Sequence, residues 1–352
     1  MDQILQPLYS VFGFVVKFLF DVVGNYGVAV ILFTILLRLA LIPLGINQFK
    51  NTIKQQGMAE EQKDIQRRYA NDKEKLQQAQ MQLYQKHGFS PFSGCLPSIL
   101  QLIIIWPVYR IISAPLVHVM GVLKDNIGSV VFDKAGAVTA STGIAKILYD
   151  MHLITNSQAT QATMFNLPLI DALRNSTEAM TQAVSQGLMK ASQLLDLTFL
   201  GKNLGKVPTY QPSLLFGPEM GTWLPLIAIP LLAVVTTFLS MKLTQSLMPG
   251  AKNAKEKKAE AERNKKNPAK KGQEGGPDPS AGMMKGMQYF LPLFTLWISF
   301  TTPAALGLYW IINNIMSIVQ QYLLYNTVGK RTPVPVAPAA KDATKNTPAL
   351  KG

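Results

Sequence analysis

Long apolar stretches alternate with polar segments along the whole chain. A helix needs about 20 apolar residues to cross the hydrocarbon core of a bilayer. Stretches near that length occur five times, and the fourth is the shortest, with roughly 15 apolar residues that rise about 22 Å as a helix. The pattern predicts an all-α, polytopic membrane protein with spans at 26–46, 95–115, 223–243, 286–302 and 305–325.

The segments on either side of the first span have helical patterns of their own. Residues 1–25 carry apolar side chains at helical spacing, which predicts an external amphipathic helix on the membrane surface. The alternative is a sixth, short span, and Lys17 in its middle argues against it. Residues 47–94 are polar and predict a cytoplasmic helical hairpin, whose second helix starts at a capping box from Asn71 to Glu74.

Three further segments lie outside the predicted spans. Residues 116–222 form a long external segment that is rich in Ala, Ser, Thr and Gln, and it has too few apolar residues to predict an independent core. Residues 244–285 and 326–352 are basic and of low complexity. We therefore predict a disordered cytoplasmic loop and a disordered cytoplasmic tail.

Positive charge is concentrated on one side of the predicted spans. Of the 34 Lys and Arg residues, 24 lie in 47–94, in 242–288 or after 325, whereas 116–222 carries 7 basic and 7 acidic residues. Loops rich in Lys and Arg stay in the cytoplasm. The chain is thus expected to be a multi-pass membrane protein, with its N-terminus outside and its C-terminus in the cytoplasm.

The sequence contains no recognisable enzyme motif. A P-loop, an HExxH pair, a CxxC pair and a glycine-rich dinucleotide fingerprint are all missing. Cys95 is the only cysteine, so a disulfide within the chain is excluded. We expect a protein that is not an enzyme and that uses no cofactor or metal.

Polar side chains recur on one side of the predicted spans. In the fifth span, Trp310, Asn313 and Ser317 follow one another at steps of three and four residues. Such groups often only join helices, at about 0.6 kcal/mol per contact. Because every span carries some of them, we favour a shared hydrophilic cavity. The candidate substrate-binding residues in the other spans are Thr34, Gln101, Tyr109 and Ser240.

Arg38 lies near the middle of the first span. It is roughly nine residues, or about 13 Å, from the cytoplasmic end of the helix, which is more than the roughly 6 Å that an arginine can snorkel. A charge at this depth costs about 2.5 to 3.5 kcal/mol, and none of the five spans contains an Asp or Glu. Water, lipid or an acidic ligand must supply its partner, so we interpret Arg38 as a functional residue.

Several stretches together resemble the core of the YidC family of membrane protein insertases. They are "YGVAVILFTILLRLALIPL", "GCLPSILQLIIIWPVYR", "LDLTFLG", "WLPLIAIPLLAVVTTFLSMK" and "YFLPLFTLWISFTTPAALGLYWIINNIMSIVQQYLLY". The resemblance covers the five spans and the hairpin in order, but neither most of 117–195 nor 251–282. It implies a protein of a bacterial plasma membrane, with five helices around a hydrophilic groove that opens to the cytoplasm and to lipid.

The resemblance also assigns roles to single residues. Arg38 matches the arginine of the family's first span, Gln101 a glutamine of its second span, and Trp310 an aromatic residue of its fifth. Ser240 stands where family members often carry a glutamine. The implied function is the insertion and assisted folding of nascent membrane proteins, with Arg38 holding acidic residues of the client.

The expected partners follow from this function and from the charge of the chain. They are nascent membrane proteins and the lipid bilayer, and no DNA. The basic loop and tail are expected to meet either a ribosome or anionic lipid headgroups, and the sequence leaves open whether a Sec translocon is a partner. The alternative function is a small-anion transporter or channel that uses Arg38 as its selectivity charge.

Overall fold

The computed structural model describes residues 2–69, 72–88, 96–247, 290 and 292–330. Predictions that fall elsewhere, among them most of the basic loop and most of the tail, lie outside the described residues. The structure is mostly helical, as predicted, and divides into two compact units. The first unit comprises 1–41, 100–242 and 280–319, and the second comprises 42–99, 243–279 and 320–352.

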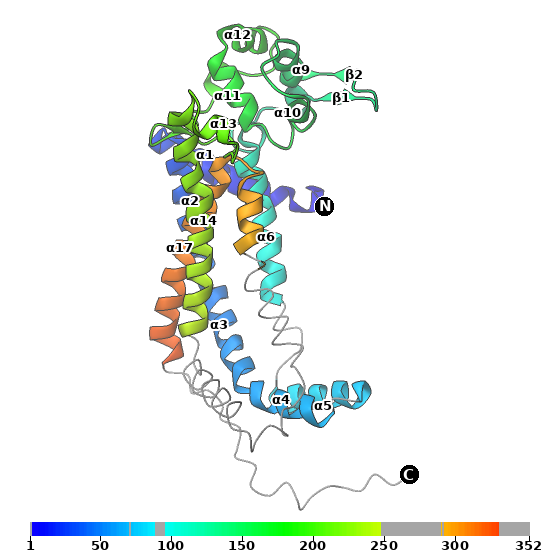
Figure 1. Cartoon of the computed structure of the whole chain (residues 1–352), viewed down its shortest axis with the longest axis vertical. Coiled ribbons are helices and arrows are strands. Elements are labelled where there is room, and N and C mark those ends of the chain that lie inside the picture. Colours follow the sequence, from blue (N-terminus) through cyan, green and yellow to red (C-terminus); the bar gives the residue numbers. More distant parts are fainter. Residues whose placement is uncertain (1, 70–71, 89–95, 248–289, 291, 331–352) are drawn as a thin grey trace, which may run out of the picture. The chain divides into compact units, whose positions relative to one another are not determined.

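The first unit holds the long apolar helices and two small β-hairpins (Figure 1). Strands β1 (Val130–Phe132) and β2 (Val138–Ser141) pair antiparallel, as do β3 (Thr198–Phe199) and β4 (Lys202–Asn203). The helices wholly or mostly in this unit are α1 (Asp2–Val23), α2 (Tyr26–Ala40), α6 (Leu96–Ser113), α7 (Pro115–His118), α8 (Lys124–Ile127), α9 (Gly143–Asp150), α10 (Asn156–Thr160), α11 (Leu167–Asn175), α12 (Thr177–Ser185), η2 (Ala191–Gln193), α13 (Pro212–Leu215), α14 (Met220–Leu247) and α17 (Ala304–Leu324). Residues 292–299 are also helical.

Two described helices are long and apolar enough to cross a membrane. They are α1, over Leu5–Val23, and α14. A third candidate is the bent pair of α2 and α3 (Ile42–Gly57), if the pair counts as one span. Helix α17 has 21 residues, but two Asn and two Gln lower its hydropathy. The described part of α6 includes a shorter apolar stretch, Ile103–Ser113.

The predicted first span, 26–46, is not one continuous helix. Helix α2 ends at Ala40, and α3 begins at Ile42. Pro43 has no amide hydrogen to donate to the carbonyl of Leu39, so the backbone ladder is interrupted just before it. The apolar pattern continues through the break, and for this reason the sequence alone does not reveal it.

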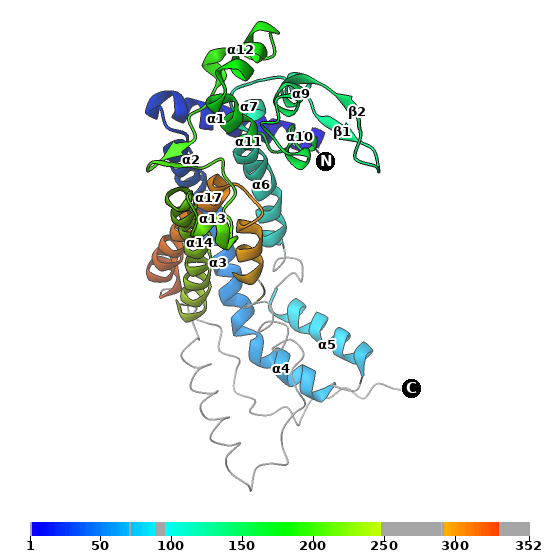
Figure 2. The same cartoon turned by 45° about the horizontal axis from the view of Figure 1, so that its top comes forward.

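Helix α1 runs crosswise at the N-terminal end of α2 in both views (Figures 1 and 2). The ring of Phe12 lies 5.6 Å from that of Phe33 in α2, measured between centroids. Lys17, which argued against a sixth span, is paired with Asp21 at 2.7 Å. Since α1 has the length and composition of a span, its location on the membrane surface stays a prediction.

Residues 116–222, called the external segment here after their predicted location, bury apolar side chains in the same hydrophobic cluster as α1, α2 and α6, so their core is not an independent one. Ile144 and Leu148 of α9 and Leu169 and Ile170 of α11 are completely buried and belong to one hydrophobic cluster with Val130 of β1. The helices that build this core have 4 to 9 residues each. Each contributes only a few apolar side chains, which explains why the sequence shows no dense apolar run.

The second unit contains a helical hairpin. It consists of α3, α4 (Ala59–Arg68) and α5 (Lys73–Lys86), and a π-helical turn, η4 (Tyr325–Gly329), also belongs to this unit. Asp72 caps α5, since its carboxylate accepts a 3.1 Å hydrogen bond from the amide of Lys75. The capping residue is therefore Asp72, one position after the predicted Asn71. Met58 and Leu83 are buried between the arms of the hairpin.

We expect the replacement Ile170→Ala to destabilise the external segment. Ile170 is fully buried, and truncation of a buried isoleucine to alanine costs about 2 to 5 kcal/mol. Hydrogen exchange of the amides in α9 and α11 should therefore become faster. Leu153→Ala is the control, because Leu153 is 40% exposed. Equal effects of the two replacements would contradict the core described above.

Acidification should loosen the hairpin between α4 and α5. Burial alone would raise the pKa of Glu61, but Lys86 and His87, each 3.1 Å from its carboxylate, outweigh burial and hold the pKa below its usual value. A carboxyl group with a lowered pKa stabilises the folded state at neutral pH, and this contribution is lost as the pH falls through the lowered pKa.

The distance between spin labels on α4 and α5 measures this effect. It should increase below about pH 4, near and under the ordinary pKa of glutamate. The Glu61→Gln variant should show the looser hairpin already at pH 7 and no further change on acidification. A wild-type distance that is independent of pH would show that this ion pair does not hold the arms together.

Candidate functional site

Arg38 is bound by a neutral side chain of another helix. Its Nε donates a 2.7 Å hydrogen bond to Oδ1 of Asn313, which brings α2 and α17 together. Among the described residues, no Asp or Glu lies within ion-pair distance of Arg38. The guanidinium is partly buried, so its charge is held by an amide dipole and lacks a carboxylate partner in the described part of the chain.

The next residue of α17 contacts a different helix. Nδ2 of Asn314 donates to Oγ1 of Thr237 at 2.8 Å and lies 3.2 Å from Oγ1 of Thr236, both on α14. Consecutive residues of an α-helix point about 100° apart. Asn313 and Asn314 therefore hold α17 between α2 and α14.

Thr34 is buried, and its hydroxyl is already used. Its Oγ1 donates to the carbonyl of Val30, one turn earlier in α2, at 2.6 Å. Trp310 is partly buried and packs against the hydrophobic core of the first unit. Thr34 lies on α2 with Arg38, and Trp310 lies on α17 with Asn313.

Among the other predicted site residues whose side chains the structure describes, none forms a hydrogen bond with Arg38. Tyr109 contacts aromatic rings instead, with centroids 6.1 Å from Trp106 and 5.9 Å from Phe165 of the external segment. Ser240 and Ser317 are partly buried, and within the described residues neither bonds to Arg38. Gln101 lies on α6, but its side chain is outside the described part of the structure.

Sequence reasoning missed a second arginine in a predicted span. Arg110 is 4% exposed, and its Nη1 donates to the carbonyl of Met164 at 3.3 Å. It sits in the last turn of α6 and bonds to the backbone of the external segment. A scan of the predicted spans for basic residues would have found Arg110, but the partner is 54 residues away in sequence.

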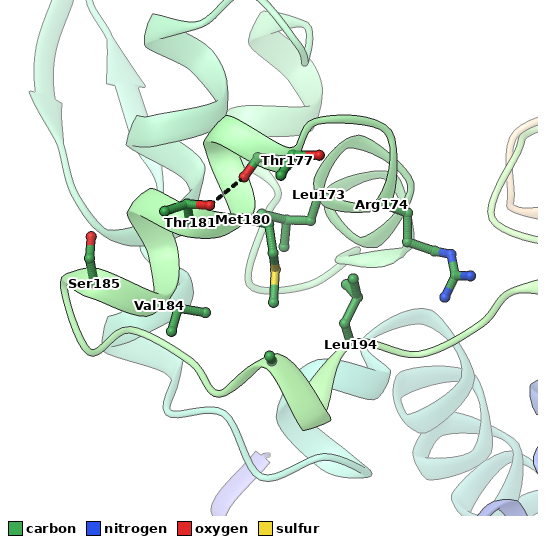
Figure 3. A pocket seen from close by; sticks show the side chains of 9 residues that line it. Leu173, Arg174, Thr177, Met180, Thr181, Val184, Ser185 and Leu194 are labelled. Atoms are coloured by element: carbon green, nitrogen blue, oxygen red, sulfur yellow. Dashed lines mark hydrogen bonds between the residues drawn. The ribbon is translucent and has the colours of Figure 1, made fainter.

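A cavity of about 620 Å³ lies in the external segment, between α11, α12 and η2 (Figure 3). Its walls are apolar at Leu173, Met180 and Leu194, and Thr181 on its edge donates to the backbone carbonyl of Thr177. None of the predicted site residues lines it. The cavity is therefore separate from the arginine site.

Apolar helices joined by polar side chains, with a charged residue inside one of them, define a polytopic α-helical membrane protein. The family model described as 60Kd inner membrane protein matches residues 18–331. The match covers most of the chain, so the chain belongs to this family. The resemblance to the YidC insertases is thereby confirmed.

Three similar proteins are named membrane protein insertase YidC or YidC 2. The chain is 38% identical over 100 residues to the membrane protein insertase YidC of Caldanaerobacter subterraneus and 41% identical over 95 residues to that of Helicobacter pylori. The first alignment covers 28% of this chain and 48% of the relative, and the second covers 27% of this chain and 17% of the relative. The aligned part is thus less than half the length of each relative. Membrane protein insertase YidC 2 of Bacillus anthracis is 24% identical over 328 residues, which are 92% of the chain and 77% of that protein.

Proposed function

We propose that the chain is a membrane protein insertase and folding chaperone that acts without enzymatic chemistry. The observation that carries the proposal is the pairing of Arg38 with Asn313 and with no described carboxylate. A hydrogen bond to a neutral amide orients a guanidinium but leaves its charge uncompensated. Family membership and the names of the relatives support the same function.

The membrane topology is part of the proposal. Five spans would surround a hydrophilic groove that opens to the cytoplasm, with the N-terminus outside and the C-terminus inside. Helices α2, α14 and α17 would be its first, third and fifth spans. The contacts of α17 with α2 and α14 support this arrangement, because they bring polar side chains of three helices together. The crosswise course of α1 supports a location at the outer surface.

Arg38 would act as a transient clamp for the client. A carboxylate in the translocated end of a nascent chain competes for the guanidinium, and ion pairing in a partly desolvated site is stronger than in water. Thr34, Gln101, Tyr109, Ser240, Trp310, Asn313 and Ser317 are the proposed contacts for the rest of the polar segment. The apolar part of the client then moves into lipid, and hydrophobic burial drives the step.

The partners proposed for the flanking segments follow from their charge. The basic loop and tail would bind either ribosomal RNA, in a salt-dependent way, or anionic lipid headgroups, at about 1 kcal/mol per lysine. Co-sedimentation with ribosomes at low and at high salt separates the two. A Sec translocon is a further candidate partner, which pull-down of the tagged chain from membranes would test.

Arg38→Ala should strongly reduce insertion of clients that have acidic translocated ends. Hydrogen bonds to charged groups contribute about 1.5 to 3 kcal/mol, so insertion should fall about tenfold or more. Arg38→Lys should keep much of the activity, because charge matters more than the shape of the guanidinium. The measurement is integration of a newly made single-span protein into liposomes, with and without two Asp residues in its translocated tail.

Two controls make this measurement specific. Lys50→Ala removes an exposed positive charge from α3 and should leave both clients unaffected. A small anion added to the same liposomes tests the alternative function. Equal loss of both clients in Arg38→Ala would indicate a damaged site, and anion uptake without client insertion would establish a transporter or channel.

Asn313→Asp should inactivate the site without removing Arg38. The new carboxylate would lie at the position of Oδ1, 2.7 Å from Nε of Arg38, and would form a permanent ion pair. The variant should unfold at a higher temperature in detergent yet insert the acidic client poorly. Asn313→Gln is the matched control, since it keeps a neutral amide beside the arginine and should retain most of the insertion. Full activity of Asn313→Asp would rule out the clamp.

A further inference from the structure

The turn between β3 and β4 displays a leucine in a conformation that leucine disfavours. Thr198 pairs with Asn203 and Phe199 with Lys202, so Leu200 and Gly201 form a two-residue turn. Their φ angles are +50° and +71°. Both positions of such a turn favour Asn and Gly, because a branched or bulky side chain crowds the backbone there. Leu200 is nevertheless 85% exposed, so no packing within the described protein compensates for the strain.

The hairpin is fixed to the N-terminal end of α2, beside which it lies in Figure 2. Nδ2 of Asn25, the N-cap residue of α2, donates to the carbonyl of Thr198 at 2.7 Å. A β-carbon at Gly27 would come within 2.7 Å of the Phe199 ring, so only glycine permits this close approach. The hairpin therefore lies next to the N-terminal end of α2.

The same segment is fixed to the beginnings of α14 and α17. Nζ of Lys202 donates to the carbonyl of Gly221 at 2.7 Å. The amides of Ala304 and Ala305 donate to the carbonyls of Lys206 and Leu204, both at 2.9 Å. Residues 198–206 therefore contact the N-terminal ends of three long helices, and four hydrogen bonds fix the position of the turn relative to these ends.

The side chains around this level are typical of a membrane interface. Trp223 in the first turn of α14 donates from Nε1 to Glu219 at 2.8 Å, and the ammonium of Lys206 lies 5.0 Å from the centre of its ring. Tyr210 and Phe216 are 74% and 75% exposed. Trp and Tyr gather where headgroups meet acyl chains. From Leu224 onward α14 exposes leucines, as expected of a surface that faces lipid.

We infer that Leu200 is a membrane anchor that inserts into the leaflet at the N-terminal ends of α2, α14 and α17. Lipid is the proposed surrounding of Leu200, because the bond from Lys202 to Gly221 fixes the turn to the start of α14, which exposes leucines from Leu224 onward. Contact with lipid also accounts for an exposed leucine at a position that favours asparagine. The anchor would hold the external segment against the bilayer, and it does not depend on the insertase function.

A fluorescent label at position 200 tests the location of the turn. The full chain with Cys95→Ser and Leu200→Cys carries an NBD group and is placed in nanodiscs whose lipids bear a nitroxide near the headgroup. An anchor of this kind reaches about 5 to 10 Å into the headgroup and acyl boundary, so quenching of about twofold or more is expected. The matched control is Val138→Cys on β2, which is 45% exposed in the native chain and should show little quenching.

Two results would overturn the inference. Quenching equal to that at position 138 would place Leu200 in water. A blue-shifted label that lipid nitroxides do not quench would mean that protein covers the turn.

A second variant keeps the test informative if labelling disturbs the turn. Leu200→Asn suits the positive φ angle, so turn preference alone predicts slower amide exchange in 198–206. Loss of a lipid anchor predicts the opposite, an exchange several-fold faster in nanodiscs. Exchange that is slower than in the wild type, or unchanged, would contradict the anchor.

Discussion

The arrangement of the long helices depends on a positive charge that has no described carboxylate partner. Arg38 occurs in a helix that is otherwise almost entirely hydrocarbon, and a charge in that setting requires a polar group on a neighbouring helix. Asn313 supplies it. Asn314 can then reach only toward another side of α17, where the hydroxyls of α14 accept its hydrogens. Two adjacent amides thereby fix the neighbours of α17 on two sides.

The external segment supplies hydrogen-bond acceptors at the N-terminal ends of α2 and α17. The first amide groups of a helix have no partner within it, and in a membrane an unsatisfied group is costly. The carbonyls of Leu204 and Lys206 accept from the first two residues of α17, and the carbonyl of Thr198 accepts from Asn25, the residue that caps α2. The composition of this segment did not predict a structural role, yet its carbonyls bind the N-terminal ends of two long helices.

The sequence predicted those features that lie within a single helix. They are the long apolar runs, the polar stripe of α17 and the isolated charge at Arg38. The buried part of the external segment was missed because short helices such as α9 and α11 contribute four buried residues each, and only tertiary contact unites them. The break after Ala40 depends on one proline, and the cap of α5 on one residue. The bond from Arg110 to Met164 joins segments that no local pattern relates.

The choice of asparagine as the partner of Arg38 has a consequence for the strength of the site. An aspartate would neutralise the guanidinium permanently, and breaking a buried ion pair costs about 3 to 5 kcal/mol. A neutral amide holds the same side chain by a single hydrogen bond, which typically contributes about 1.5 to 3 kcal/mol when one partner is charged. Under the proposed function, an arriving carboxylate would have only a modest interaction to displace, and the amide would bind the guanidinium again when the carboxylate leaves. Such a site would favour brief contacts over tight binding, as the release of clients requires.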